Sequence, residues 1–93
     1  MTTPTKAPAR SATAATVRDH LARELSIEPA EIADDDVLKD LPGADSLHLL
    51  RLVTRLETHW DTEFSDEEIF GATTFDDLVS LVMSHLEAGR DAA

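Results

Sequence analysis

Residues 45–60 read DSLHLLRLVTRLETHW, and this stretch decides the fold. Its apolar residues recur three and four positions apart, on one side of an α-helix: Leu49, Leu52, Val53, Leu56 and Trp60. At the helical rotation of about 100° per residue they form a stripe about 100° wide. Asp45 suits the N-cap, because its carboxylate can accept hydrogen bonds from the first free backbone N–H groups. We therefore predict a helix from Asp45 to Trp60 with one buried face.

Two other long helices are predicted, one on either side of this stretch. Residues 13–25 carry apolar residues at helical spacing, namely Ala14, Val17, Leu21 and Leu25. A last helix is expected to start at Thr74, which forms a capping box with Asp77, and to end at Gly89. Its apolar stripe comprises Phe75, Leu78, Val79, Val82 and Leu86.

The segments between these helices lack a sustained apolar period. Residues 26–44 contain two prolines and a glycine, so we predict a long loop with a single turn near Pro29–Ile32. The apolar residues of this loop are scattered: Ile27, Ile32, Val37, Leu38 and Leu41. A loop of that length is unusual in a compact domain and usually has a functional reason. One short helical turn is expected over Asp66–Phe70, ended by Gly71.

These elements predict an all-α fold, a small antiparallel bundle of three main helices and one short helix with a long loop after the first. The 93 residues suffice for one domain, expected over residues 13–88 between disordered tails at 1–12 and 89–93. The chain has no cysteine, so a disulfide scaffold and thiolate chemistry are excluded. It shows neither a secretory signal nor an apolar run of membrane-spanning length, which favours a cytoplasmic protein.

The balance of charge narrows the choice of partner. Nineteen acidic and eight basic residues give a net charge of -11. Such a surface repels nucleic acid and anionic membranes, so we expect neither as a partner and favour basic protein surfaces. The acidity lies in residues 26–40 and 61–77, whereas the charges of residues 45–60 cancel. Charge runs of this kind are usually solvated faces.

The run Leu41-Pro42-Gly43-Ala44-Asp45-Ser46-Leu47, followed by Leu52-Val53 and Leu56-Glu57, resembles the acyl carrier protein family. The likeness continues through Asp61-Thr62-Glu63-Phe64, Asp66-Glu67-Glu68 and Thr73-Thr74-Phe75, and it covers residues 14–86. In that family a phosphopantetheinyl transferase attaches phosphopantetheine from coenzyme A to the serine of Asp-Ser-Leu. The thiol of this arm then carries acyl or aminoacyl groups as thioesters between enzymes. The resemblance implies that Ser46 is the attachment residue, that Asp45 and Leu47 flank it, and that the chain is not an enzyme.

The physical chemistry of a helix start agrees with this role. Unpaired N–H groups and the positive end of the helix dipole would stabilise a phosphodiester at Ser46, although Asp45-Ser46 could also be only a helix cap. Leu47 points about 160° away from the centre of the apolar stripe, so we expect it to be exposed. Because Leu47 directly follows the serine, we expect it to contact partner enzymes. The alternative is that it is an isolated surface leucine without a function.

The outward face of this helix departs from the acidic surface that the family usually has there, because it carries Arg51 and Arg55. We expect partner enzymes to contact a surface formed by Leu47, Leu50, Arg51, Thr54, Arg55, Glu57 and Ile69. Arg51-Leu52-Val53 and Arg55-Leu56 resemble peptidyl carriers, Asp45 is more like fatty acid and polyketide carriers, and Pro42 reads as an insertion. The combination favours a discrete, monomeric carrier of an acyl or aminoacyl group in a specialised polyketide or nonribosomal peptide pathway, with a loading enzyme and downstream enzymes as partners.

Two other functions compete with that of a carrier. An enzyme lacks support, because Ser46 and His48 are two positions apart and do not face each other on a helix. His48 and His59 lie about 16 Å apart along it, too far to share a metal. Asp34-Asp35-Asp36 is not a calcium loop, because Leu38 and Lys39 stand where that loop needs an oxygen ligand and a glycine. An unmodified helical docking module remains the alternative.

Overall fold

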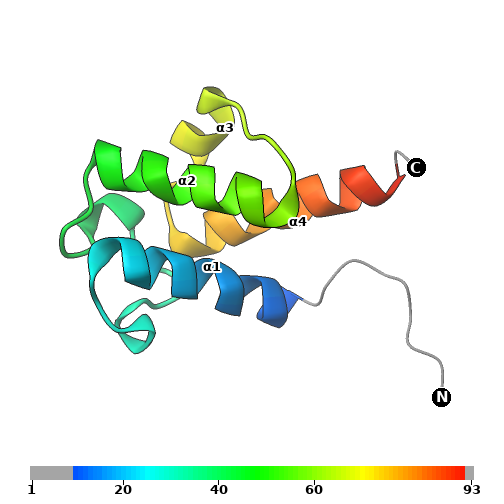
Figure 1. Cartoon of the computed structure of the whole chain (residues 1–93). Coiled ribbons are helices and arrows are strands. Elements are labelled where there is room, and N and C mark those ends of the chain that lie inside the picture. Colours follow the sequence, from blue (N-terminus) through cyan, green and yellow to red (C-terminus); the bar gives the residue numbers. More distant parts are fainter. Residues whose placement is uncertain (1–9, 92–93) are drawn as a thin grey trace, which may run out of the picture.

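The computed structural model describes residues 10–91, and the side chains of residues 10–88. Four α-helices and two short 3₁₀ turns follow one another along this part of the chain (Figure 1). They are α1 (Arg10–Leu25), η1 (Pro29–Glu31), η2 (Leu38–Asp40), α2 (Ser46–Trp60), α3 (Asp66–Gly71) and α4 (Phe75–Asp91). No strand occurs within residues 10–91, where the only β-type pairing is an isolated bridge between Val37 and Thr74. The predicted all-α fold of three main helices and one short helix is confirmed.

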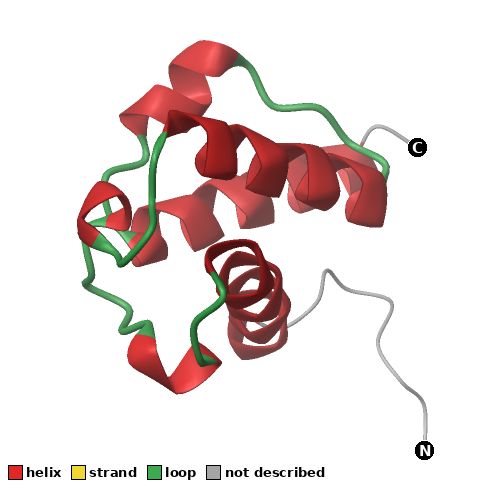
Figure 2. Ribbon diagram, turned by 60° about the vertical axis from the view of Figure 1, so that its left-hand side comes forward, coloured by secondary structure: helices red, strands yellow, loops and turns green. Residues whose placement is uncertain are grey.

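The helix α1 is the element against which the other two main helices pack. It contacts both α2 and α4. In Figure 1 it runs in the opposite direction to both, and Figure 2 shows it nearly end-on, so it crosses them at an angle. The short α3 lies beyond α2 on the side away from α1. None of the helices in the described part is both long and apolar enough to cross a membrane.

The predicted apolar stripes form the core. Of the stripe residues, ten are fully or nearly fully buried: Val17, Leu21, Leu25, Leu52, Val53, Leu56, Phe75, Leu78, Val79 and Val82. The outermost residues of the stripes, Ala14, Leu49, Trp60 and Leu86, are only partly buried because they lie at the edges of the cluster. One core therefore fixes the orientation of α2 about its own axis.

The helix starts use the caps that the sequence predicts. Thr74 and Asp77 exchange hydrogen bonds, with the Thr74 hydroxyl accepting from the Asp77 N–H at 3.1 Å and the Asp77 carboxylate accepting from the Thr74 N–H at 3.1 Å. Ser65 and Glu68 form the same reciprocal pair at the start of α3. These bonds satisfy N–H groups that have no partner inside their own helices.

The outer ends of the bundle differ from the prediction. The first helix begins at Arg10 and not at Thr13, because the Arg10 guanidinium donates to the Asp76 carbonyl and the Ser80 hydroxyl of α4 and adds a turn. The last helix continues through Gly89 to Asp91. A single glycine inside a helix costs only about 1 kcal/mol, and no left-handed turn ends α4 there. Of the expected tails, 1–9 and 92–93 lie outside the described residues, and the division at 13–88 stays a prediction.

The loop between α1 and α2 is more ordered than predicted. The expected turn at Pro29 is confirmed as η1, but η2 was missed. Backbone hydrogen bonds tie the loop to the start of α4, including Phe75 N–H to the Asp36 carbonyl at 2.9 Å. From α1, the Arg18 guanidinium donates to the Ile32 carbonyl and lies 4.5 Å from the centre of the Phe75 ring. The loop is thus fixed by residues distant in sequence.

Two leucines of α2 test the placement of the core. Leu56 is fully buried, whereas the Leu47 side chain projects into solvent with 55% of its surface exposed. Leu56→Ala should lower the free energy of unfolding by about 2–5 kcal/mol, because it removes a packed side chain and leaves a cavity. Leu47→Ala should change it by less than about 0.5 kcal/mol. Urea unfolding of both variants measures the difference, and similar losses would contradict this packing.

The capping carboxylates predict how stability depends on pH. Hydrogen bonds from the backbone N–H of Thr74 and of Ser65 hold the pKa of Asp77 and of Glu68, respectively, below their ordinary values. A lowered folded-state pKa adds stability that is complete above the unfolded value and is lost as pH falls through the folded one. Asp77→Asn keeps an acceptor but cannot titrate. As the pH falls from about 5 to about 2, the free energy of unfolding should decrease less for Asp77→Asn than for the wild type. Parallel curves of unfolding free energy against pH would contradict the capping role.

Candidate functional site

A tight turn leads the chain into α2. The Leu41 side chain is buried, and the Ala44 N–H donates to the Leu41 carbonyl at 3.0 Å. Pro42 and Gly43 occupy the two central positions, and Gly43 has a φ of 78°. This hydrogen bond, the proline and the left-handed glycine are those of a type II β-turn, in which a side chain at the position of Gly43 would be strained. Pro42 is therefore part of a turn that sets where α2 begins.

Asp45 caps α2 as predicted. Its backbone is extended, and its Oδ1 accepts from the His48 N–H at 2.8 Å and lies 2.8 Å from the His48 Nδ1. The backbone N–H of His48 and then its ring hold the pKa of the Asp45 carboxyl below its ordinary value of 3.8. Asp45 is thus an exposed anion at neutral pH, and the His48 ring is turned toward it.

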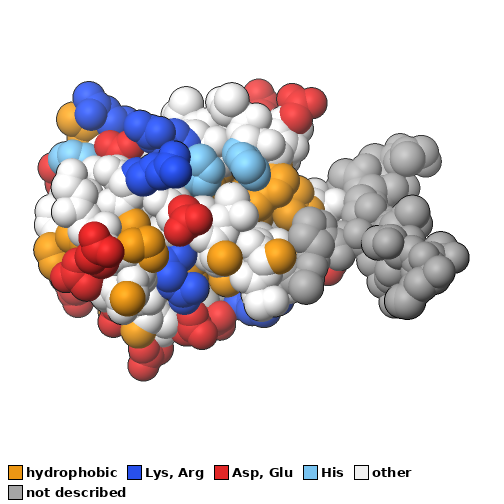
Figure 3. All heavy atoms as spheres, turned by 60° about the horizontal axis from the view of Figure 1, so that its bottom comes forward, with side chains coloured by type: hydrophobic (Ala, Val, Ile, Leu, Met, Phe, Trp, Pro, Cys, Tyr) orange, Lys and Arg blue, Asp and Glu red, His pale blue; other side chains and the backbone are white. Residues whose placement is uncertain are grey.

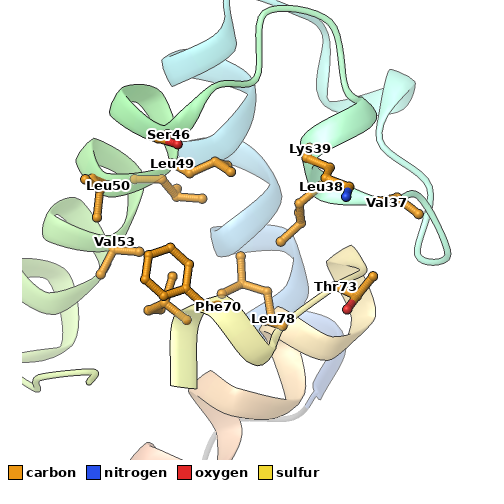
Figure 4. A pocket seen from close by; sticks show the side chains of 13 residues that line it. Val37, Leu38, Lys39, Ser46, Leu49, Leu50, Val53, Phe70, Thr73 and Leu78 are labelled. Carbon is orange, nitrogen blue, oxygen red and sulfur yellow. The ribbon is translucent and has the colours of Figure 1, made fainter. Parts of the chain in front are cut away.

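Ser46 is the first residue of α2, and its side chain is exposed. It lies at the edge of a pocket of about 320 Å³ (Figure 4). In Figure 4 Leu49, Leu50 and Val53 extend along α2 from Ser46, and Leu38 faces them from η2. The remaining lining residues are Val37, Lys39, Leu52, Ile69, Phe70, Ala72, Thr73 and Leu78. The hydroxyl is accessible from solvent and adjoins a mostly apolar cavity.

The short helix α3 forms one wall of this pocket. Ile69 is half-buried in that wall, and its place on a partner surface stays a prediction. Phe70 also lines the pocket but is 77% exposed, and it is not among the predicted site residues. A helix of six residues cannot bury two adjacent large side chains on one face, which is the signal that could have found it. Glu68 fixes α3 to α4 through the His85 ring, with Oε2 2.9 Å from Nε2.

The other residues of the expected partner surface fall into two groups. Leu47 and Leu50 are 55% and 49% exposed, and Thr54 is exposed with its hydroxyl donating to the Leu50 carbonyl at 3.1 Å. Glu57 is partly buried, and its carboxylate accepts from the Phe64 N–H at 3.0 Å. Glu57 therefore holds the connection between α2 and α3, and its contact with a partner stays a prediction.

Arg51 and Arg55 are exposed as predicted but are also paired. Arg55 Nε lies 3.0 Å from Glu24 Oε1, and Arg51 Nη1 lies 4.0 Å from Glu24 Oε2. The Glu24 side chain is 5% exposed, whereas those of Arg51 and Arg55 are 61% and 52% exposed. The two guanidiniums thus cover a carboxylate of α1 and still present most of their surface to solvent.

The histidines do not assemble a reactive site with Ser46. His48 is held by Asp45, His85 by Glu68, and the rings of His20 and His59 meet edge to face at 5.3 Å. Among the described residues no group of three or more His, Asp or Glu side chains could hold a metal ion. What this region offers chemically is one accessible hydroxyl at a helix N-terminus beside an apolar pocket.

Comparison with known proteins gives this arrangement its context. Residues 15–82 match the family described as "Phosphopantetheine attachment site". An acyl carrier protein from Clostridium acetobutylicum is 35% identical over 71 residues, which are 76% of this chain and 92% of the relative.

Two solved structures are similar in fold. The acyl carrier protein from Enterococcus faecalis superposes with a TM-score of 0.69 and 27% identity over 84% of this chain and 99% of its own. The HMG-ACPI domain of the CurA module from Lyngbya majuscula superposes with a TM-score of 0.78 over 97% of this chain and 91% of its own, and at 22% identity it supports the fold alone. With a helical bundle, an accessible serine at a helix start and these matches, the chain belongs to the acyl carrier protein family, whose phosphopantetheine-bearing members are carriers and not enzymes.

Proposed function

We propose that Ser46 carries the phosphopantetheine and that the chain holds acyl or aminoacyl groups as thioesters on this arm. The observation that supports the assignment is the position of Ser46, an exposed serine at the first residue of α2 and at the edge of the apolar pocket. When bound, the group supplies a flexible arm that ends in a thiol, which the chain itself lacks because it has no cysteine. Carriage therefore depends on modification.

The start of α2 fits the phosphate of this group. A helix N-terminus favours an anion through its free N–H groups and its dipole. The Asp45 carboxylate is a second anion nearby, but it is exposed and bonded to the His48 N–H and ring, so solvent and these donors offset its charge. Ser46 is exposed, which leaves its hydroxyl accessible to a modifying enzyme.

The partners follow from this role. We infer a phosphopantetheinyl transferase, an enzyme that loads the arm and enzymes that receive its cargo. Leu47 and Leu50 are large apolar side chains left in solvent within one turn of Ser46, and such exposed neighbours mark a contact surface. Phe70, across the pocket on α3, extends this surface.

We further propose that the pathway is a specialised one, of the polyketide or nonribosomal peptide type. Supporting this are the exposed residues on the outward side of α2, where Arg51 and Arg55 replace the acids that such carriers of primary fatty acid synthesis present. The pocket beside Ser46 has a mostly apolar lining, which suits the hydrocarbon part of an acyl group better than a charged aminoacyl group.

Modification in vitro tests the assignment of Ser46. Incubation with coenzyme A and a permissive phosphopantetheinyl transferase should raise the intact mass by one phosphopantetheinyl group. Ser46→Ala should abolish the gain. Ser65→Ala is the matched control, because Ser65 is also an exposed serine at the start of a helix and should be dispensable.

Two outcomes would contradict the assignment of Ser46. A mass gain that persists in Ser46→Ala and disappears in Ser65→Ala would place the arm on α3 and contradict the proposal. A wild-type chain that stays unmodified while a control carrier is modified in the same tube would favour the docking module instead.

A further inference from the structure

A cationic patch lies on the seam between α1 and α2 of this acidic molecule. Arg51 and Arg55 of α2 lie there over Glu24 of α1. Arg23 of α1 and Arg55 are also near enough to His20 for their charges to act on it, where the His20 ring meets that of His59. On the face shown in Figure 3, Lys and Arg side chains gather next to histidines. The net charge of the chain is -11, so this patch opposes the sign of the whole.

The charges of the patch act on the His20 ring. Burial is the first cause of the lowered pKa of His20, and the charges of His59, Arg23 and Arg55 lower it further. Glu24 and Asp19 are acids beside these groups. Glu24 is nearly buried beneath Arg51 and Arg55, so its single charge offsets part of theirs from inside while their outer surfaces face solvent.

The same seam is hollowed and partly apolar. An open groove is lined by Glu24, Leu50, Arg51, Thr54 and Arg55. Leu50 adds an apolar contact that is 49% exposed beside the two guanidiniums. A surface that combines exposed arginines with an apolar side chain is typical of protein-binding sites, where arginine binds carboxylates through paired hydrogen bonds.

We propose that this groove docks an acidic segment of a partner enzyme, with carboxylates on Arg51 and Arg55 and an apolar side chain against Leu50. That the partner is an enzyme rests on the proposed carrier function; the preference for an acidic segment does not. A nucleic acid fits less well, because the net charge of -11 would repel a long polyanion.

Glu24 makes the proposal testable in both directions. It competes from within for the same guanidiniums that the partner would use. Glu24→Gln should therefore tighten binding of an acidic segment, whereas loss of either arginine should weaken it. If the Glu24–arginine contacts only held α1 against α2, Glu24→Gln would have no reason to tighten binding.

The experiment titrates ¹⁵N-labelled, unmodified full chain with a peptide that alternates Glu-Glu with Leu, and with its Gln-Gln-Leu counterpart, at low salt. The acidic peptide should shift amide signals of residues 20–24 and 50–55, and the neutral one should not. Glu24→Gln should lower the Kd about two- to fivefold, and Arg51→Gln should raise it by a similar factor. Arg10→Gln, at the far contact with Asp76, should leave it unchanged.

Two further variants keep the result clear. Arg55→Gln alone is unsuitable, because it removes a partner of the nearly buried Glu24 carboxylate. The double variant Glu24→Gln/Arg55→Gln removes both charges and should bind the acidic peptide more weakly than Glu24→Gln alone. Ser46→Ala should bind like the wild type, so failure of the attachment proposal would leave this test intact.

The proposal is overturned if Glu24→Gln fails to tighten binding, if the neutral peptide binds equally, or if the shifts map to other surfaces. If an oligothymidylate bound as tightly as the acidic peptide, the groove would be a general anion site. If the chain self-associated in a salt-sensitive way in sedimentation, the groove would bind a second copy of the chain. Either result would also overturn it.

Discussion

The burial of the α2 stripe against α1 is the contact on which the rest of the site depends. Leu52 and Leu56 are almost fully buried, and the 3.6-residue period then fixes every other side chain of the helix. Leu47 and Leu50 must project outward, and the N-terminus of α2 must lie at one end of the bundle. Ser46 is accessible because the core leaves the first turn of α2 outside it.

The loop and α3 convert this exposed helix end into a pocket. Leu38 and Leu41 anchor the loop in the core, and backbone bonds from the loop to the start of α4 hold it beside α2. On the other side, the Glu68–His85 contact holds α3 to α4. The cavity beside Ser46 thus depends on contacts among four elements, and only its α2 wall is local in sequence.

This division explains how much could be predicted from the sequence. Periodicity and capping residues are local signals, so the three stripes, the Asp45 cap and the Thr74–Asp77 box were predicted correctly. The second 3₁₀ turn, the extra turn at Arg10 and the use of Glu57 as an acceptor depend on partners far along the chain or in a loop. No pattern within one element specifies such partners, and the pairing of Glu24 with Arg51 and Arg55 was missed for the same reason.

The central claim, that Ser46 holds the arm, can be read from one peptide of the protein purified from its native host. Cleavage after Lys39 and Arg51 releases residues 40–51, in which Ser46 is the only hydroxyl-bearing side chain. We expect this peptide to carry the added mass of phosphopantetheine, with or without cargo, and fragmentation to place it on Ser46. An unmodified 40–51 peptide together with phosphopantetheine on another peptide would contradict the claim.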